Sequence, residues 1–296
     1  MKNKVITHIL ALLLLCCAAS SCGSTSNAMK SGDPDLIYEY AMELYNAERW
    51  QKAASTFSAI MSFFDGTTDE DKINFYYARC LFKNRDYALA ADELDYFRRT
   101  FGRSEFIEDA EGMYVLCYYY QTSDASRDQS TTSRTLLIID EYLSRYPNSP
   151  QADTFKEIRA ELMGRLYDKD YINAFTYYKI GRYKSAIFAF KNALKRYPES
   201  PRREELLFYT VASGYELAKN SITSIQADRF LTMLDTYYTF VAEFPESEFM
   251  PEVERMAKDT KKFLERRNAA QGDESVVFEA SDEKKTRRKK SKDNID

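Results

Sequence analysis

Apolar residues recur along most of the chain with the period of an amphipathic helix, and short polar turns interrupt them at regular intervals. The clearest example lies between Tyr177 and Pro201, where two apolar-periodic runs flank the turn signal at Gly181 and Arg182. The second run ends at Tyr197, because Pro198 lacks the backbone N–H that a helix needs to continue. This stretch therefore predicts a hairpin of two helices.

The hairpin has the residue spacing of a tetratricopeptide repeat, a unit of about 34 residues in which small residues let paired helices approach closely. Its landmark residues are Ala174, Tyr183, Ala186, Phe190, Ala193 and Pro198. Two earlier copies have landmarks at Ala41, Leu44, Trp50, Ala53, Phe57 and Ile60, and at Ala78, Leu81, Tyr87, Ala90, Leu94 and Phe97. We interpret Trp50 as the aromatic residue that packs at the start of a second helix rather than as part of a ligand cage.

The later repeats end in similar short segments. Residues 145–150 read Arg-Tyr-Pro-Asn-Ser-Pro, residues 196–201 read Arg-Tyr-Pro-Glu-Ser-Pro, and residues 243–248 give a third version. In each segment proline stops one helix, and serine is a suitable cap for the next. The polar segment 122–133 is longer than a repeat turn, and its pattern fits an ordered loop or a mobile insertion equally well.

The sequence thus predicts an all-α protein, a right-handed α-solenoid of about five tetratricopeptide-like helical hairpins with a C-terminal capping helix. We expect the solenoid over residues 33–267, with repeats over 33–65, 70–102, 105–147, 151–198 and 202–245, and the cap over 251–267.

The N-terminus has the pattern of a lipoprotein signal peptide over residues 1–21. Lys2 and Lys4 precede an apolar run that is too short for a comfortable membrane span. Ala19-Ser20-Ser21-Cys22 then resembles a lipobox, which predicts lipidation of Cys22; an ordinary secretory signal is the alternative. Residues 22–32 are expected to form a lipidated flexible tether, and the lack of an acidic residue soon after Cys22 favours a periplasm-facing position.

The amino-acid composition excludes most types of enzyme active site. The only histidine, His8, leaves with the signal peptide, so no Ser-His-Asp triad or His-based zinc site can form. No phosphate-binding glycine loop occurs, and the many carboxylates are explained by solubility at solvent-facing helical positions. We therefore predict no enzyme activity, metal or cofactor, although a pair of carboxylates for glycan cleavage stays formally possible.

Charge and cysteine usage limit the partners further. The net charge of -4 does not suggest a basic surface for nucleic acid. Cys80 and Cys117 lie among apolar helical residues and are interpreted as buried thiols, with a disulfide as the alternative. Residues 268–296 are expected to form a disordered basic tail, whose run 284–290 could instead contact anionic lipid or an acidic partner.

Aromatic and basic residues gather on the first helices of the repeats, which line the concave face in this architecture. The repeat register suggests a peptide-binding groove formed by Tyr38, Met42, Tyr45, Phe75, Arg79, Phe82 and Lys83, and continued in the fourth repeat by Tyr171, Phe175, Tyr178 and Lys179. Such side chains suit an extended peptide that contains aromatic residues. The alternative is that several of these rings only pack between neighbouring helices.

The lipobox, the tether and the five repeats with Tyr-Pro-x-Ser-Pro ends together resemble the BamD family, the lipoprotein subunit of the machinery that assembles β-barrels in the outer membrane. The resemblance covers residues 22–262, and the ends at Phe63-Phe64 and Phe101-Gly102 depart from it. It implies a non-enzymatic scaffold that is lipid-anchored to the outer membrane and faces the periplasm. The implied partners are the barrel-forming subunit, bound by C-terminal repeats, and unfolded outer-membrane proteins, received by N-terminal repeats.

The alternative function is a different repeat lipoprotein, a scaffold for cell-wall synthesis, division or pilus assembly. Repeats alone do not separate the two, because a fold does not fix its partner.

Overall fold

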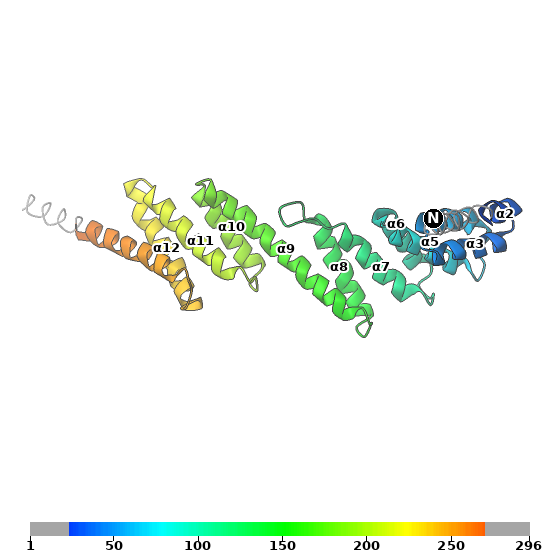
Figure 1. Ribbon diagram of the computed structural model, residues 1–296. Helices are drawn as coiled ribbons and strands as arrows, with labels where there is room; N and C mark the ends of the chain where they lie inside the picture. The colour runs from blue at the N-terminus through cyan, green and yellow to red at the C-terminus, as the bar shows by residue number, and fades with distance from the viewer. Residues whose placement is uncertain (1–23, 270–296) are drawn as a thin grey trace, which may run out of the picture. The chain divides into compact units, whose positions relative to one another are not determined.

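Helices joined by short turns make up the computed structural model, which describes residues 24–269, and no strand occurs within that range (Figure 1). The predicted all-α class is confirmed. The expected signal peptide over residues 1–21, the lipidation site Cys22 and all but the first two residues of the expected tail (268–296) lie outside the described residues.

Five helical hairpins follow one another along the chain. The helices, in chain order, are α2 (Ser24–Ser31), α3 (Pro34–Asn46), α4 (Trp50–Ile60), the short 3-10 helix η2 (Met61–Phe63), α5 (Glu70–Lys83), α6 (Tyr87–Thr100), α7 (Ile107–Tyr120), α8 (Ser130–Arg145), α9 (Ala152–Lys179), α10 (Tyr183–Arg196), α11 (Arg203–Lys219) and α12 (Thr223–Glu243). Residues 250–269 are helical as well. The hairpins are α3–α4, α5–α6, α7–α8, α9–α10 and α11–α12, and neighbouring hairpins pack through α4 on α5, α6 on α7, and α10 on α11.

The chain divides into two compact units. The boundary lies between Met163 and Gly164, inside the 28-residue helix α9. The N-terminal half of α9 packs on α8, where the ring of Phe155 meets Tyr142 at 4.7 Å. The C-terminal half packs on α11, where Phe175 meets Tyr209 at 4.7 Å. The extra length of α9 therefore gives each half its own neighbours.

Residues 24–31 form α2, whereas the sequence predicts a flexible tether over residues 22–32. The helix stops before Gly32, whose φ of 66° suits a residue without a Cβ. The Ser31 hydroxyl donates to the Ala28 carbonyl at 2.7 Å and accepts from the Asp33 amide at 3.1 Å. α2 also contacts α3, so the expectation of an unstructured tether is corrected for these eight residues.

The turns inside three hairpins share one backbone conformation. Glu48, Arg85 and Gly181 have φ values of 55°, 64° and 74°. In each case the amide of the next residue bonds back to the first helix, as Arg182 does to the Tyr177 carbonyl at 2.9 Å. This is the left-handed cap that commonly ends helices, and glycine is its preferred residue.

The turn that follows each hairpin occurs in five equivalent copies, four between hairpins and one before the helix over residues 250–269. In each copy an aromatic carbonyl accepts the amide of a Ser or Thr three residues later, and the hydroxyl of that Ser or Thr accepts the amide two residues further on. The five pairs are Phe64 and Thr67, Phe101 and Ser104, Tyr146 and Ser149, Tyr197 and Ser200, and Phe244 and Ser247. The first two copies lack the proline of the others, so the hydroxyl rather than the proline is common to all five turns.

The long connection between α7 and α8 is an ordered loop. Gln129 is buried, and its side-chain amide donates to the carbonyls of Asp124 at 2.7 Å and Arg127 at 3.2 Å. Its side-chain oxygen accepts from the Thr132 hydroxyl at 2.8 Å. These bonds replace the packing that a short repeat turn would supply, and α8 consequently begins at Ser130.

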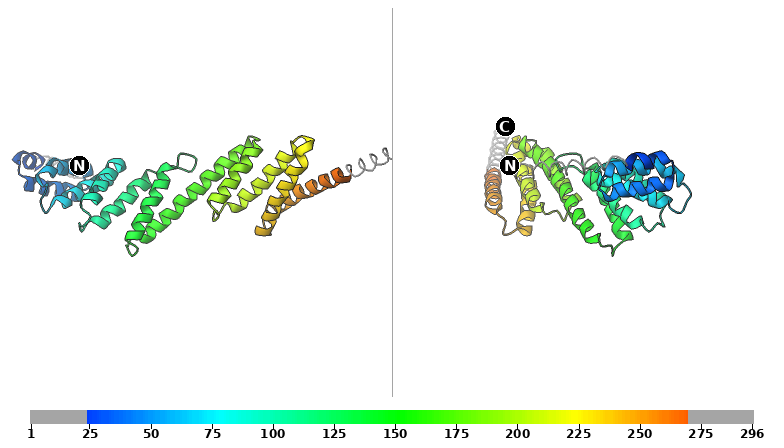
Figure 2. Two further views of the ribbon diagram at one scale, coloured as in Figure 1. Left: turned by 180° about the vertical axis from the view of Figure 1, so that it is seen from behind. Right: turned by 45° about the vertical axis from the view of Figure 1, so that its right-hand side comes forward.

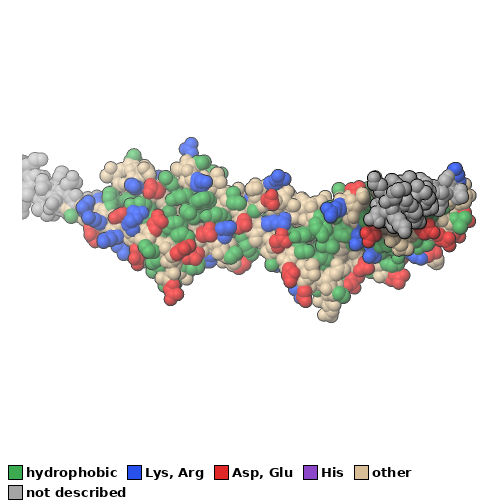
Figure 3. Space-filling model, in the orientation of Figure 1, with side chains coloured by type: hydrophobic (Ala, Val, Ile, Leu, Met, Phe, Trp, Pro, Cys, Tyr) green, Lys and Arg blue, Asp and Glu red, His purple; other side chains and the backbone are tan. Residues whose placement is uncertain are grey.

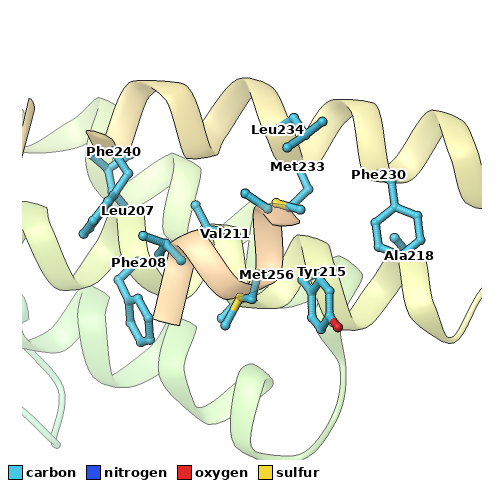
Figure 4. Packing of buried hydrophobic residues seen from close by; sticks show 13 residues of the cluster. Leu207, Phe208, Val211, Tyr215, Ala218, Phe230, Met233, Leu234, Phe240 and Met256 are labelled. Atoms are coloured by element: carbon cyan, nitrogen blue, oxygen red, sulfur yellow. The ribbon is translucent and has the colours of Figure 1, made fainter. Parts of the chain in front are cut away.

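The second unit has a core shared by three helices (Figure 4). Leu207, Val211 and Tyr215 of α11 face Phe230, Met233 and Phe240 of α12, and Met256 enters from residues 250–269. Figures 1 and 2 draw these three helices, coloured yellow to orange, side by side. The predicted capping helix therefore covers the apolar face of the last hairpin, as the ends of helical repeat proteins require.

Both cysteines in the described part of the chain are buried free thiols, as the sequence predicts. Cys80 on α5 and Cys117 on α7 are fully inaccessible. Burial raises the pKa of each thiol to about 12. These residues therefore act as small apolar side chains.

Candidate peptide-binding site

Two neighbouring helices of the first unit present the residues that the sequence places in a groove. α3 begins cleanly because the Asp33 carboxylate accepts the Asp35 amide at 3.0 Å and Pro34 occupies its first turn. Along α3, Tyr38, Met42 and Tyr45 follow the i, i+4, i+7 spacing of one helix face. All three side chains are half-buried.

Cations from α5 lie over the tyrosine rings of α3. The Lys72 Nζ lies 5.1 Å from the centre of the Tyr38 ring, and the Arg79 guanidinium lies 6.0 Å from that of Tyr45. Tyr76 stands between these cations on α5, and its ring meets Tyr45 edge-on at 5.1 Å. We call Tyr38, Tyr45, Lys72, Tyr76 and Arg79 the aromatic–cationic stripe.

The charge of Arg79 is not neutralised by an acidic neighbour. Among residues 24–269, no carboxylate lies within ion-pair distance of its guanidinium, whereas Arg203, for example, binds Glu243 at 2.6 Å. Arg79 is instead held over the rings of Tyr45 and Phe75. A cation placed in this way keeps its capacity for an incoming carboxylate.

Two side chains of the stripe, Lys72 and Tyr45, have raised pKa values. A hydrogen bond with Tyr38 raises the pKa of Lys72, which keeps its ammonium group charged. Burial raises the pKa of Tyr45, and the positive charge of Arg79 opposes that shift. Both shifts favour the protonated forms, the ammonium of Lys72 and the phenol of Tyr45.

Phe75 does not line the surface, and its assignment to the groove is corrected. Only 1% of Phe75 is exposed, and its ring stacks on Phe106 at 4.5 Å and packs on Phe97 at 5.9 Å. The residue faces α6 and the start of α7, because it lies one position, about 100°, away from Tyr76 on the helix.

Phe82 and Lys83 sit at the other end of α5. The Phe82 ring lies 5.8 Å from Tyr87 and 6.3 Å from Tyr120, and those two tyrosines stack at 4.7 Å. Lys83 is exposed beside this cluster. The structure thus brings Tyr38, Tyr45 and Arg79 together and places Phe82 in a neighbouring aromatic group.

Two residues of the stripe, Lys72 and Tyr76, were missed by sequence reasoning. Lys72, Tyr76, Arg79 and Lys83 follow the same i, i+4, i+7, i+11 series. Reading this helical spacing directly along α5 finds both residues, whereas transferring the register of the fourth repeat to α5 does not.

The residues expected from the fourth repeat gather around a ring that the sequence did not single out. Tyr209 of α11 lies 6.2 Å from Tyr171, 4.7 Å from Phe175 and 5.1 Å from Tyr178. Arg202 lies 4.7 Å from the centre of the Tyr171 ring, but Asp168 and Glu205 bind its guanidinium. This second cluster therefore offers aromatic surface with a cation that is already paired.

The described part of the chain has neither a cluster of metal-binding side chains nor a helix suited to cross a membrane. Residues 24–269 contain no group of three or more His, Cys, Asp or Glu side chains arranged to hold a metal ion. No helix in the same range combines the length and apolar character needed to span a bilayer.

Comparison with known proteins gives a family and several relatives. The model of the YfiO family, described as outer membrane lipoprotein, matches residues 30–229. Outer membrane protein assembly factor BamD of Vibrio cholerae is 24% identical over 215 residues, covering 68% of this chain and 86% of that protein. The protein of the same name from Rickettsia prowazekii is 24% identical over 212 residues, covering 71% and 84%.

Two further matches are shorter or more distant. BamD of Caulobacter vibrioides is 26% identical over 140 residues, covering 47% of this chain and 46% of that protein. Among solved structures, the complex of the TPR2AB domain of yeast Sti1 with pHSP90 aligns with a TM-score of 0.36 and 13% identity, covering 77% of this chain and 98% of that chain.

Proposed function

Because the chain belongs to the YfiO family of outer membrane lipoproteins, we propose that it is a scaffold and receptor without catalytic activity in outer-membrane protein assembly. Its anchor is a lipidated Cys22, and its helical hairpins face the periplasm. The C-terminal hairpins bind the barrel-forming subunit, and the N-terminal hairpins receive unfolded outer-membrane proteins.

The observation that carries the receptor role is Arg79 on the aromatic–cationic stripe. A guanidinium without a carboxylate partner, set against tyrosine rings, suits a peptide end that has an aromatic side chain and a free carboxylate. The relatives named as assembly factors for outer membrane proteins support a client of this kind.

The scaffold role is supported by the fold and by the composition of the hairpins. Histidine is absent after residue 8, and the described carboxylates are largely exposed or paired with arginine. Stacked hairpins offer extended surfaces for several partners at once. Binding without turnover is therefore the activity that we assign.

Charge reversal at Arg79 tests the receptor site. We expect Arg79→Glu to weaken binding of a short peptide with a C-terminal aromatic residue and free carboxylate by about tenfold or more, since an attraction of roughly 1.4 kcal/mol becomes a repulsion. Binding is measured by fluorescence titration with a labelled peptide.

Two controls separate the site from general charge effects. The same peptide with an amidated C-terminus should bind wild type weakly and lose little more on Arg79→Glu. Lys52→Glu reverses an exposed charge on α4, outside the stripe, and should leave the affinity unchanged. Equal affinity of wild type and Arg79→Glu for the free-carboxylate peptide would refute the site.

A further inference from the structure

Hairpin α9–α10 carries an open groove that is separate from the aromatic–cationic stripe on α3 and α5. The groove has a volume of about 600 Å³ and is lined by one face of α9 and one face of α10, with Tyr177 and Phe188 as its large apolar residues. Asn173 and Asn192 add amide groups from the two helices, and Lys184 adds a positive charge. All of these residues belong to the second unit.

The same positions in the first two hairpins are covered or polar. In the repeat register that aligns Trp50, Tyr87 and Tyr183, Tyr177 corresponds to Leu44 and Leu81. Those leucines are 4% and 6% exposed, whereas Tyr177 is 43% exposed. A face that is buried in two hairpins is therefore left open in the fourth.

Phe188 on α10 is an exposed apolar residue at a position that is polar in the first two hairpins. Its counterparts in the first two hairpins are Ser55 and Asp92, which are exposed polar residues, while Phe188 is 70% exposed. Figure 3 shows hydrophobic side chains gathered over the part of the second unit where Figure 1 draws α10 and α11. An exposed phenylalanine beside an open groove marks a binding surface rather than a packing need.

The charged residues of the groove indicate which kind of ligand it binds. Of the four cations on α10, Lys184 and Arg196 line the groove, whereas Lys191 and Lys195 lie outside its lining. Asp170 is the only carboxylate in the groove lining, and Arg196 binds it at 2.9 Å. The groove is thus suited to an extended segment that is both acidic and apolar.

A segment of that chemistry lies in the chain itself, beyond the described residues. Residues 273–283 read Asp-Glu-Ser-Val-Val-Phe-Glu-Ala-Ser-Asp-Glu, with acidic residues on both sides of Val276, Val277 and Phe278. We propose that this segment docks in the α9–α10 groove, with Phe278 against Phe188 and Tyr177 and its carboxylates near Lys184.

The length of the chain permits this contact. Arg267 donates to the Thr223 carbonyl at 3.3 Å, which places the end of the described chain beside the start of α12. α12 packs on α11 and α11 on α10, so the groove lies two helix spacings away, about 20 Å. Phe278 lies nine positions after residue 269, a distance along the chain that spans up to about 30 Å when extended.

Photo-crosslinking in the full mature chain tests the proposal. A photo-reactive phenylalanine analogue replaces Phe278, and crosslinked peptides are mapped by mass spectrometry. We expect crosslinks within the same molecule to residues 170–177 and 184–196, at a yield that does not change with protein concentration. Phe188→Ala should lower that yield by about tenfold, the factor for losing one aromatic contact of roughly 1.4 kcal/mol.

Matched variants make the result decisive. Leu137→Ala removes an equally exposed apolar side chain from α8 in the first unit and should leave the yield unchanged. Because Phe188 is exposed, its variant should keep the helical signal and melting curve of wild type, which excludes unfolding. Crosslinks to the groove that form only between two copies of the protein, or crosslinks that avoid the groove, would overturn the proposal. It would also be overturned if the groove captured an acidic segment of another protein equally well in the full chain and in a chain that ends at residue 269.

Discussion

Among the described residues, two kinds of arginine differ in their partners. Arg145 and Arg196, each from a Tyr-Pro segment, bind carboxylates on the first helix of their own hairpin, Glu111 and Asp170. Arg79 has only aromatic neighbours. The first group joins the helices of a hairpin, and the second leaves a charge available to a ligand.

The Arg203–Glu243 pair predicts a pH-dependent contribution to stability. Arg203 holds Glu243 through two bonds of 2.6 and 2.8 Å, which lowers the pKa of the carboxyl. A lowered carboxyl pKa stabilises the fold above the unfolded value of about 4.3 and ceases to do so as pH falls through the folded value. The pair is partly exposed, so we expect Glu243→Gln to cost about 0.5 kcal/mol at pH 7.

The check is urea unfolding of wild type and Glu243→Gln at several values of pH. The difference between the two midpoints should shrink steadily from pH 6 to pH 3. Glu246→Gln, at an exposed carboxylate in the turn that follows, serves as the control. A difference that stays constant over this range would show that the ion pair is not its cause.

Single residues were the hardest part to predict from sequence. Phe75 and Tyr76 are adjacent aromatic residues, and one faces the core while the other joins the stripe. Hydrophobic periodicity does not separate them, because an amphipathic tyrosine is acceptable on either face. The neighbours Phe106 and Tyr209 come from other helices, so only tertiary structure reveals their contacts.

Helical elements followed from the sequence much more closely. The spacing of Ala, Tyr and Phe fixes the paired faces of a hairpin, and local turn chemistry fixes its ends. The five turns that follow the hairpins use the same Ser or Thr hydroxyl, including the two that lack proline. The helix α2 was not foreseen, because its polar and small residues carry no clear amphipathic pattern and it is held by Gly32 and by contact with α3.

Two helix glycines predict opposite effects of the same substitution. A Cβ at Gly214 would lie 3.1 Å from Cβ and Cγ of Met233, where α11 approaches α12 closely, whereas a Cβ at Gly164 in α9 would meet nothing within 4 Å. Gly214→Ala should destabilise by about 1 kcal/mol, because overpacking outweighs the gain in helix propensity. Gly164→Ala should stabilise by up to about 1 kcal/mol.

Thermal unfolding monitored by circular dichroism measures whether each substitution raises or lowers the stability. The melting temperature should fall for Gly214→Ala and rise for Gly164→Ala. Stabilisation by both substitutions would mean that Met233 moves aside without cost, and the close approach of the two helices would then not require glycine.

At the scale of the whole molecule, the sequence predicts five hairpins and a cap but not the division at Met163 and Gly164. Repeat spacing reports where a hairpin begins and ends, and it carries no information on the length by which α9 exceeds the other first helices. The two halves of α9 have different packing partners, Tyr142 of α8 and Tyr209 of α11.

Membrane attachment through Cys22 has its own test. Cys22→Ala should leave the hairpins folded but release the protein from the membrane fraction or impair its processing, since the acyl chains supply the anchoring free energy. Cell fractionation measures the distribution. Cys17→Ala, inside the expected signal peptide, should remain membrane-bound, and membrane retention of Cys22→Ala at the wild-type level would contradict the lipid anchor.

The central claim is that these hairpins serve assembly of outer-membrane proteins, and affinity purification of the lipidated protein from detergent-solubilised membranes tests it most directly. We expect the barrel-forming subunit of the assembly machinery to be recovered at near-equal amount with wild type and with Arg79→Glu, because that substitution affects only the client site. Recovery of cell-wall synthesis, division or pilus proteins without the barrel-forming subunit would contradict the account.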